Sequence, residues 1–115
     1  MINLKISIAL ATFNGARFLK DQLASLVEQT FLPAELVVTD DGSTDETLAI
    51  LEWFSHVAPF HVSVHLNHQR LGYGMNFLKA ASLCSGGNRP LEPRALEVEF
   101  FPMEEVLHEK VKIHW

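Results

Sequence analysis

Acidic side chains are concentrated in the stretch ELVVTDDGSTDETLAIL, residues 35–51. Four carboxylates gather in its middle: Asp40, Asp41, Asp45 and Glu46. At neutral pH these groups repel one another unless a helix N-terminus, a solvated turn or a bound partner offsets their charge. The stretch is therefore either a well-capped turn or a binding site.

Other residue types in the chain suit a nucleotide ligand. A carboxylate of Asp40 or Asp41 can accept a hydrogen bond from a pyrimidine N3–H or a ribose hydroxyl. Phe13 can lie against a base, Arg70 can face a diphosphate, and Gly72 lets the chain pass close to it. The turn interpretation stays open, because aspartates and glycines also serve as ordinary turn and loop residues.

Strands and helices are predicted to alternate over the first two thirds of the chain. Apolar, β-branched runs predict strands at residues 6–13, 35–40 and 61–67. Apolar residues at helical spacing predict helices at residues 16–30, 47–54 and 75–83. Helices of this length between strands imply right-handed crossovers and parallel strands. We therefore expect an α/β fold, a Rossmann-like parallel sheet with flanking helices.

Capping and turn residues predict where these elements end. Ser43 and Glu46 have the spacing of a capping box for the second helix, and Pro33 is expected to stop the first. The segment SGGNRPLEPR, with two glycines and two prolines, indicates a connector. We predict a nucleotide-binding half over residues 1–86 and a divergent tail over residues 87–115. In that tail we expect a strand in ALEVEFF, then a helix or a final strand.

The candidate ligand residues fall at the ends of the predicted strands. In open α/β sheets, ligands bind outside the carboxyl ends of the strands. Three such segments carry polar or glycine residues: 11–14, 40–42 and 67–74. We expect them to converge into one site.

The motifs ATFNG, QT, DDGSTD and LGYGMNF occur in this order between about Ile6 and Gly86. In that arrangement the chain resembles the opening of family 2 glycosyltransferases, inverting enzymes of the GT-A fold, and ATFNGARFLKDQL is most similar to their rhamnosyltransferase-like branch. The resemblance implies a UDP- or dTDP-sugar donor. It places Ala11, Phe13 and Asp41 at the base and ribose, with Asp40 as their neighbour. It places Arg70 and Gly72 near the diphosphate.

After Gly86 the sequence departs from that family. Its members usually continue to an Asp-x-Asp pair that holds Mg²⁺ or Mn²⁺, and no such pair occurs here. Glu97 and Glu99 are the nearest substitute, but strand alternation favours a solvated face for both. The resemblance also implies an acceptor half with a catalytic base, which we do not recognise in these 115 residues, so we assign no catalytic residue and no metal ligand. The alternative to a transferase is a non-catalytic nucleotide-binding module or truncated product.

Composition and spacing exclude other classes of ligand. The 115-residue chain is 48% hydrophobic, enough for one core, and its net charge of -5 leaves no basic face for nucleic acid. His61, His65 and His68 have no carboxylate close in sequence, so we predict no zinc site there. Gly72 and Gly74 lack the third glycine of a dinucleotide-binding loop, which argues against NAD.

Cysteine content and apolar runs bear on location and assembly. Cys84 is the single cysteine, and we expect a buried thiol in a reducing cytoplasm. No run approaches the roughly 20 apolar residues of a membrane span, whereas peripheral membrane attachment stays open. The tail is apolar at Phe101, Val106 and Trp115, so we expect a homo-oligomer with the tail at the contact.

Overall fold

The computed structural model describes residues 5–29, 32–84, 94–100 and 109–114, the last two ranges by their backbone. In chain order the elements are β1 (Lys5–Thr12), α1 (Ala16–Val27), β2 (Glu35–Asp40), α2 (Thr47–Val57), β3 (His61–Leu66), α3 (Tyr73–Leu83), β4 (Arg94–Phe100) and β5 (Glu109–His114). The predicted alternation of strands and helices is confirmed.

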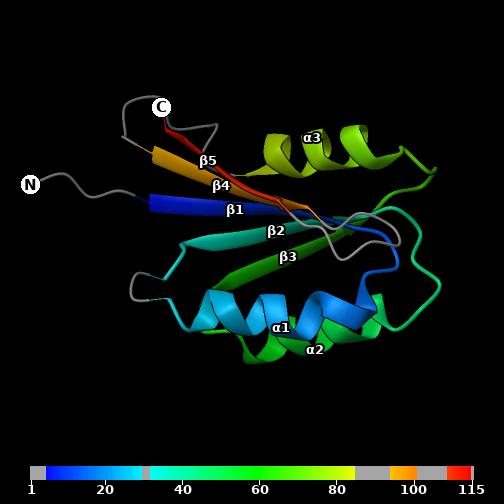
Figure 1. The fold of residues 1–115 in the computed structure, drawn as a ribbon, viewed down its shortest axis with the longest axis horizontal. Helices are drawn as coiled ribbons and strands as arrows, with labels where there is room; N and C mark the ends of the chain where they lie inside the picture. The colour runs from blue at the N-terminus through cyan, green and yellow to red at the C-terminus, as the bar shows by residue number, and fades with distance from the viewer. Residues whose placement is uncertain (1–4, 30–31, 85–93, 101–108, 115) are drawn as a thin grey trace, which may run out of the picture.

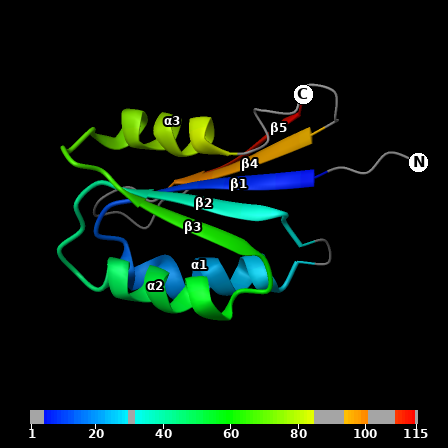
Figure 2. The same cartoon turned by 180° about the vertical axis from the view of Figure 1, so that it is seen from behind.

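The strands form one five-stranded sheet in the order β3-β2-β1-β4-β5. The first four are parallel, and β5 is antiparallel to β4. Helices α1 and α2 cover one face and α3 covers the other (Figures 1 and 2). The chain runs outward from β1 to β3 and then returns to the opposite side of β1. The predicted Rossmann-like α/β sheet is therefore confirmed, with a change of direction at β1. In open α/β sheets, ligands bind near the carboxyl ends of the strands at such a point.

The core lies mainly between the sheet and the α1–α2 layer. Its buried members are Ile8, Leu10, Leu19, Leu23, Leu26, Leu36, Val38, Ile50, Leu51 and Phe54. On the α3 side, small side chains such as Ala9 and Ala80 pack with Val37 and Cys84. Every residue of β2 is buried, whereas β3 is an edge strand with half-exposed side chains. The predicted ligand residues that follow β1 and β2 are therefore held by two buried strands.

The tail joins the same sheet. The predicted strand in ALEVEFF is β4, which pairs with β1, and the alternative of a final strand is the one observed, as β5. Phe101, Val106 and Trp115 lie outside the described residues. The division at residues 86 and 87 stays a prediction.

One predicted helix end and one predicted helix cap are wrong, whereas α2 begins at Thr47 as predicted. Helix α1 ends at Val27, before Pro33 is reached. The capping box does not form, because the Ser43 hydroxyl donates to Asp40 Oδ1 at 2.6 Å instead. The amide of Thr47, the first residue of α2, donates to Asp45 Oδ1 at 2.9 Å. The serine is engaged within the turn and is not available to the helix.

Candidate functional site at the strand ends

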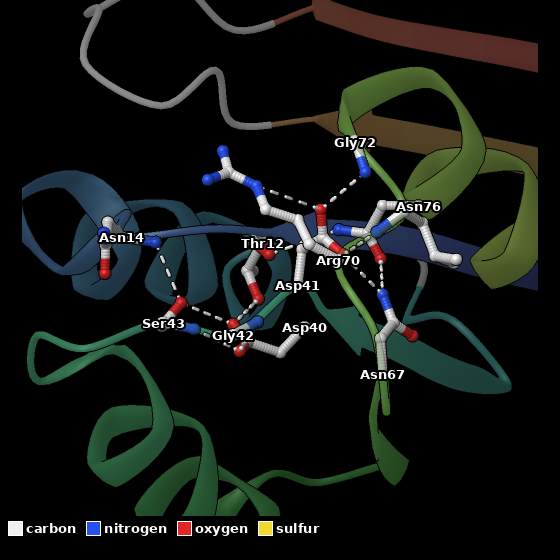
Figure 3. A network of polar contacts seen from close by, with 11 residues as sticks. Thr12, Asn14, Asp40, Asp41, Gly42, Ser43, Asn67, Arg70, Gly72 and Asn76 are labelled. Carbon is white, nitrogen blue, oxygen red and sulfur yellow. Dashed lines mark hydrogen bonds and ion pairs between the residues drawn. The ribbon is translucent and has the colours of Figure 1, made fainter.

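The three strand-end segments converge as predicted (Figure 3). The amide of Asp41, just after β2, donates to the Thr12 carbonyl at the end of β1 at 3.0 Å. The amide of Asn67, just after β3, donates to the Asp40 carbonyl at 2.9 Å. These two backbone bonds fix the ends of β1, β2 and β3 relative to one another.

Asp40 holds the turn beneath the site. Its Oδ1 accepts hydrogen bonds from the hydroxyls of Thr12 and Ser43, each at 2.6 Å. Its Oδ2 accepts from the amides of Gly42 at 3.0 Å and Ser43 at 2.8 Å. Gly42 has φ +94°, which a side chain would strain. With four donors already on a fully buried carboxylate, Asp40 supports the site from below.

Asp41 points the other way and fastens the loop after β3. Its Oδ1 accepts from the Leu71 amide at 2.7 Å, and its Oδ2 accepts from the Gly72 amide at 2.9 Å. Its Oδ1 also accepts from Asn67 Nδ2 at 3.0 Å. Figure 3 shows Arg70 above this carboxylate, with Nε 3.9 Å from Oδ2.

The electrostatics of Asp41 follow from these contacts. Burial by itself raises the pKa of the carboxyl. The hydrogen bonds from Leu71, Asn67 and Gly72, together with the charge of Arg70, outweigh burial and hold the pKa below its ordinary value. Asp41 is therefore an anion at neutral pH, with most of its acceptor capacity already in use.

Asn67 is the hub of the polar network. Besides its bond to Asp41, its Nδ2 donates to Asn76 Oδ1 at 2.8 Å, and its Oδ1 accepts from Lys79 Nζ at 2.8 Å. Asn76 Nδ2 in turn donates to the Thr12 carbonyl at 3.2 Å. The network ties α3 to the ends of β1 and β2.

Sequence reasoning missed Asn76 and Lys79. The available signal is that Asn76 precedes Ala80 by four residues and so shares the buried face of α3. A polar residue on such a face needs buried partners.

Asp45 differs from Asp40 and Asp41, because its carboxylate accepts a hydrogen bond from the first residue of α1. Its Oδ2 accepts from the Ala16 amide, the first of α1, at 3.1 Å. Asn14, at φ 50°, accepts from the amides of Thr44 and Asp45 at 2.7 and 3.3 Å. Burial raises the pKa of Asp45, but hydrogen bonds from Thr47 and Ala16 outweigh it and lower that pKa. The acidic stretch is thus both a capped turn and, at Asp41, part of a cavity wall.

The cavity itself is small. Its lining residues are Ala11, Thr12, Phe13, Asp41, Arg70, Tyr73 and Asn76. The Arg70 guanidinium carbon lies 3.9 Å from the centroid of the Phe13 ring. Of the predicted site residues, the structure brings Ala11, Phe13, Asp41 and Arg70 to the cavity wall, while Gly72 reaches Asp41 through its amide.

The described residues offer no built metal site. Within residues 5–29, 32–84, 94–100 and 109–114, no group of three His, Cys, Asp or Glu side chains comes together. The oxygens of Asp40 and Asp41 already accept bonds from N–H and O–H donors, so they do not suit a divalent cation. The side chains of Glu97 and Glu99 lie outside the described part. In the same described part, no helix is long and apolar enough to cross a membrane.

Comparison of the sequence with known proteins finds glycosyltransferases. The model of the family described as "Glycosyl transferase family 2" matches residues 7–87. The dTDP-rhamnosyl transferase RfbG of Shigella flexneri is 34% identical over 71 residues, which cover 61% of this chain and 25% of that protein. These matches confirm the resemblance found in the sequence motifs.

Solved structures agree on the fold. S. aureus TarS in complex with UDP matches with a TM-score of 0.66 and 27% identity, over 88% of this chain and 29% of that one. The mannosyltransferase PcManGT of Pyrobaculum calidifontis, in complex with GDP-Man and Mn²⁺, matches with a TM-score of 0.61. At 18% identity, over 88% of this chain and 31% of that one, it shows the fold alone. The chain spans less than a third of the length of these proteins.

Proposed function

Because the chain belongs to glycosyl transferase family 2, we propose that the cavity at the strand ends receives the nucleotide of a UDP- or dTDP-sugar donor. Two relatives support this choice of nucleotide: TarS is solved in complex with UDP, and RfbG is a dTDP-rhamnosyl transferase. The observation that carries the proposal is the meeting of Phe13, Asp41 and Arg70, which come from three separate strand ends.

Each residue has a role that its chemistry suits. The Phe13 ring offers a flat face to the base, and Asp41 Oδ2 accepts the N3–H of a pyrimidine. Ala11 leaves room beside them because its side chain is a single methyl group. Arg70 and the backbone at Gly72 face the diphosphate, where a guanidinium can form two parallel hydrogen bonds.

We propose that the reaction served by this site is the transfer of a hexose from the nucleotide sugar, with inversion at the anomeric carbon. The described residues supply donor recognition for it, and we derive no chemical step from them. The second candidate, a module that binds nucleotide without transfer, is supported by the sequence, which contains no Asp-x-Asp pair. Hydrolysis of UDP-sugar by the chain in the presence of Mn²⁺ would favour the transferase, and binding without turnover would favour the module.

Isothermal titration calorimetry with UDP tests the binding proposal. Asp41→Ala should weaken UDP binding by about 1.5–3 kcal/mol, the value of a hydrogen bond to a charged group. Asp21→Ala is the matched control, because this exposed aspartate lies on α1 away from the cavity and should leave binding unchanged. Equal UDP affinity in parent and Asp41→Ala would show that Asp41 serves only the fold. GDP should bind more weakly than UDP to the parent.

We also propose a cytoplasmic location and self-association, with peripheral membrane contact left open. The location is supported by the cysteine content, since Cys84 is the single cysteine of the sequence and no internal disulfide can form. Burial, and secondarily the charge of Glu35, raise the pKa of the Cys84 thiol to about 12, which makes it an inert core residue. The outermost tail strand, β5, has β4 on one side only, and such edges recruit other chains. Light scattering at micromolar concentration should show a dimer or larger assembly, and a monodisperse monomer would refute it.

A further inference from the structure

Arg70 occupies a defined place in the cavity and is not simply a mobile surface arginine. Its guanidinium lies over the Phe13 ring at 3.9 Å, and its Nε is 3.9 Å from Asp41 Oδ2. The Arg70 side chain is 54% exposed, whereas that of Asp41 is 3% exposed. Both side chains line the cavity, Arg70 on its solvent-exposed side and Asp41 on its buried side. Figure 3 shows the Arg70 side chain next to the Asp41 carboxylate.

The hydrogen bonds of Asp41 leave little room for another donor. An ionised carboxylate has about four acceptor positions. Asn67 and Leu71 use two on Oδ1, and Gly72 uses one on Oδ2. The remaining position is on Oδ2, the oxygen that Arg70 approaches.

A pyrimidine would need the same two surfaces that Arg70 covers. It would lay its flat face on the Phe13 ring and direct N3–H to Asp41 Oδ2. The guanidinium carbon lies 3.9 Å from the centroid of the Phe13 ring, the distance of a stacked contact. A base cannot stack on that face of the ring while the guanidinium stays there.

We propose that Arg70 is a placeholder for the base: it fills the pyrimidine position when no nucleotide is bound, and it swings off Phe13 and Asp41 when nucleotide enters. This inference rests on the function proposed above and adds a second role for Arg70. The arginine opposes binding of the base and, once displaced, favours binding of the diphosphate. Arg70 thereby makes the site discriminate between a nucleoside and a nucleoside diphosphate.

The expected change in uridine affinity follows from the contact between Arg70 and the Phe13 ring, which must break when the base enters. A cation–π contact at an exposed site corresponds to a factor of about 2 to 5 in an equilibrium constant. Without the arginine, uridine should bind about 2- to 5-fold more tightly. UDP should lose its contact with the guanidinium, so the ratio of UDP to uridine affinity should fall.

The experiment compares uridine and UDP binding, by isothermal titration, in the parent and in Arg70→Ala. The chain contains a matched control, because Arg17 also lies over a phenylalanine, with its guanidinium carbon 5.3 Å from the Phe18 ring. That second stack is on α1, outside the cavity lining. Arg17→Ala should leave both affinities unchanged, and thermal unfolding of each variant checks that the fold is intact.

A second measurement needs no variant. Proton NMR of the parent should show the Arg70 side-chain signals shifted upfield by the Phe13 ring, and uridine should remove that shift. The proposal is overturned if uridine binds while the shift persists, or if Arg70→Ala binds uridine no better than the parent. If neither uridine nor UDP binds the parent or the variant, the proposed nucleotide function fails and this inference fails with it.

Discussion

Replacing Asn67, the hub of the polar network, with aspartate should destabilise the folded chain, and more so at high pH than at low pH. Asn67→Asp keeps the shape of the side chain but removes the N–H group that donates to Asp41 Oδ1 at 3.0 Å. The new carboxylate at position 67 would lie next to the buried carboxylate of Asp41. Lys79, whose Nζ lies 2.8 Å from Asn67 Oδ1, would offset part of the new charge.

The loss of folding stability in Asn67→Asp can be estimated from the distance between the two carboxylates. Two unit charges about 4 Å apart repel by about 4 kcal/mol at an effective dielectric constant of 20. If Lys79 offsets about half of this, Asn67→Asp loses about 2 kcal/mol more stability at pH 8 than Asn67→Ala, which removes the same donor without adding charge.

The pH dependence has a definite sign. In the parent, the hydrogen bonds to Asp41 lower its pKa in the folded state, so its stabilising contribution is complete at neutral pH and is lost only as the pH falls through that lowered value. In Asn67→Asp the two carboxylates compete for one proton, which raises the pKa of the pair in the folded state. The variant should therefore gain stability relative to Asn67→Ala as the pH falls from 8 to 5.

Urea denaturation of both variants at pH 5 and pH 8 measures this difference directly. Comparing the two variants at each pH cancels the contribution of every ionisable group that both share. If the difference between the variants is the same at both pH values, the side chain of Asn67 does not face Asp41 and the network is misassigned.

Three further predictions concern the loop, the metal and the thiol. Gly72 has φ 83° and ψ 164°, a region essentially confined to glycine, so Gly72→Ala should cost about 1–3 kcal/mol in urea denaturation. Gly74 lies inside α3 with nothing within 4 Å of an added Cβ, so Gly74→Ala should instead gain up to about 1 kcal/mol from helix propensity. Mn²⁺ should change UDP affinity little in calorimetry, because Asp40 already accepts from four donors and Asp41 from three, which leaves no pair of carboxylates to bridge the ion to the diphosphate. A large gain that vanishes in Glu97→Gln/Glu99→Gln would contradict this. Cys84, with its pKa raised to about 12, should resist a thiol reagent at pH 8 until urea unfolds the chain, and rapid labelling of the folded chain would refute its burial.

The sequence predicted the sheet well because its signals there are local. The continuous apolar runs of β1 and β2 are typical of strands covered on both faces, and both strands are buried. Their carboxyl ends then had to lie side by side, which placed Phe13 and Asp41 together without any structural knowledge.

The roles of the individual side chains could not be predicted in the same way. Asp40, Asp41 and Asp45 look alike in sequence, but their partners lie in different loops, some about thirty residues away. The spacing of Ser43 to Glu46 predicts a helix cap, but the Ser43 hydroxyl donates to the carboxylate of Asp40 instead. Long-range partners decide such contacts, and spacing along the chain carries no information about them.

The most direct test of nucleotide binding at the strand ends is a titration of the ¹⁵N-labelled chain with UDP, followed through its backbone amide signals. The amides of Leu71 and Gly72 donate to Asp41, and Phe13 is one of the residues that line the cavity. We predict that UDP shifts these three signals in a saturable way and leaves those of Trp53 and Val57 on α2 unchanged. Saturable shifts confined to α2, or no shifts at all, would contradict the assignment of this cavity as the nucleotide site.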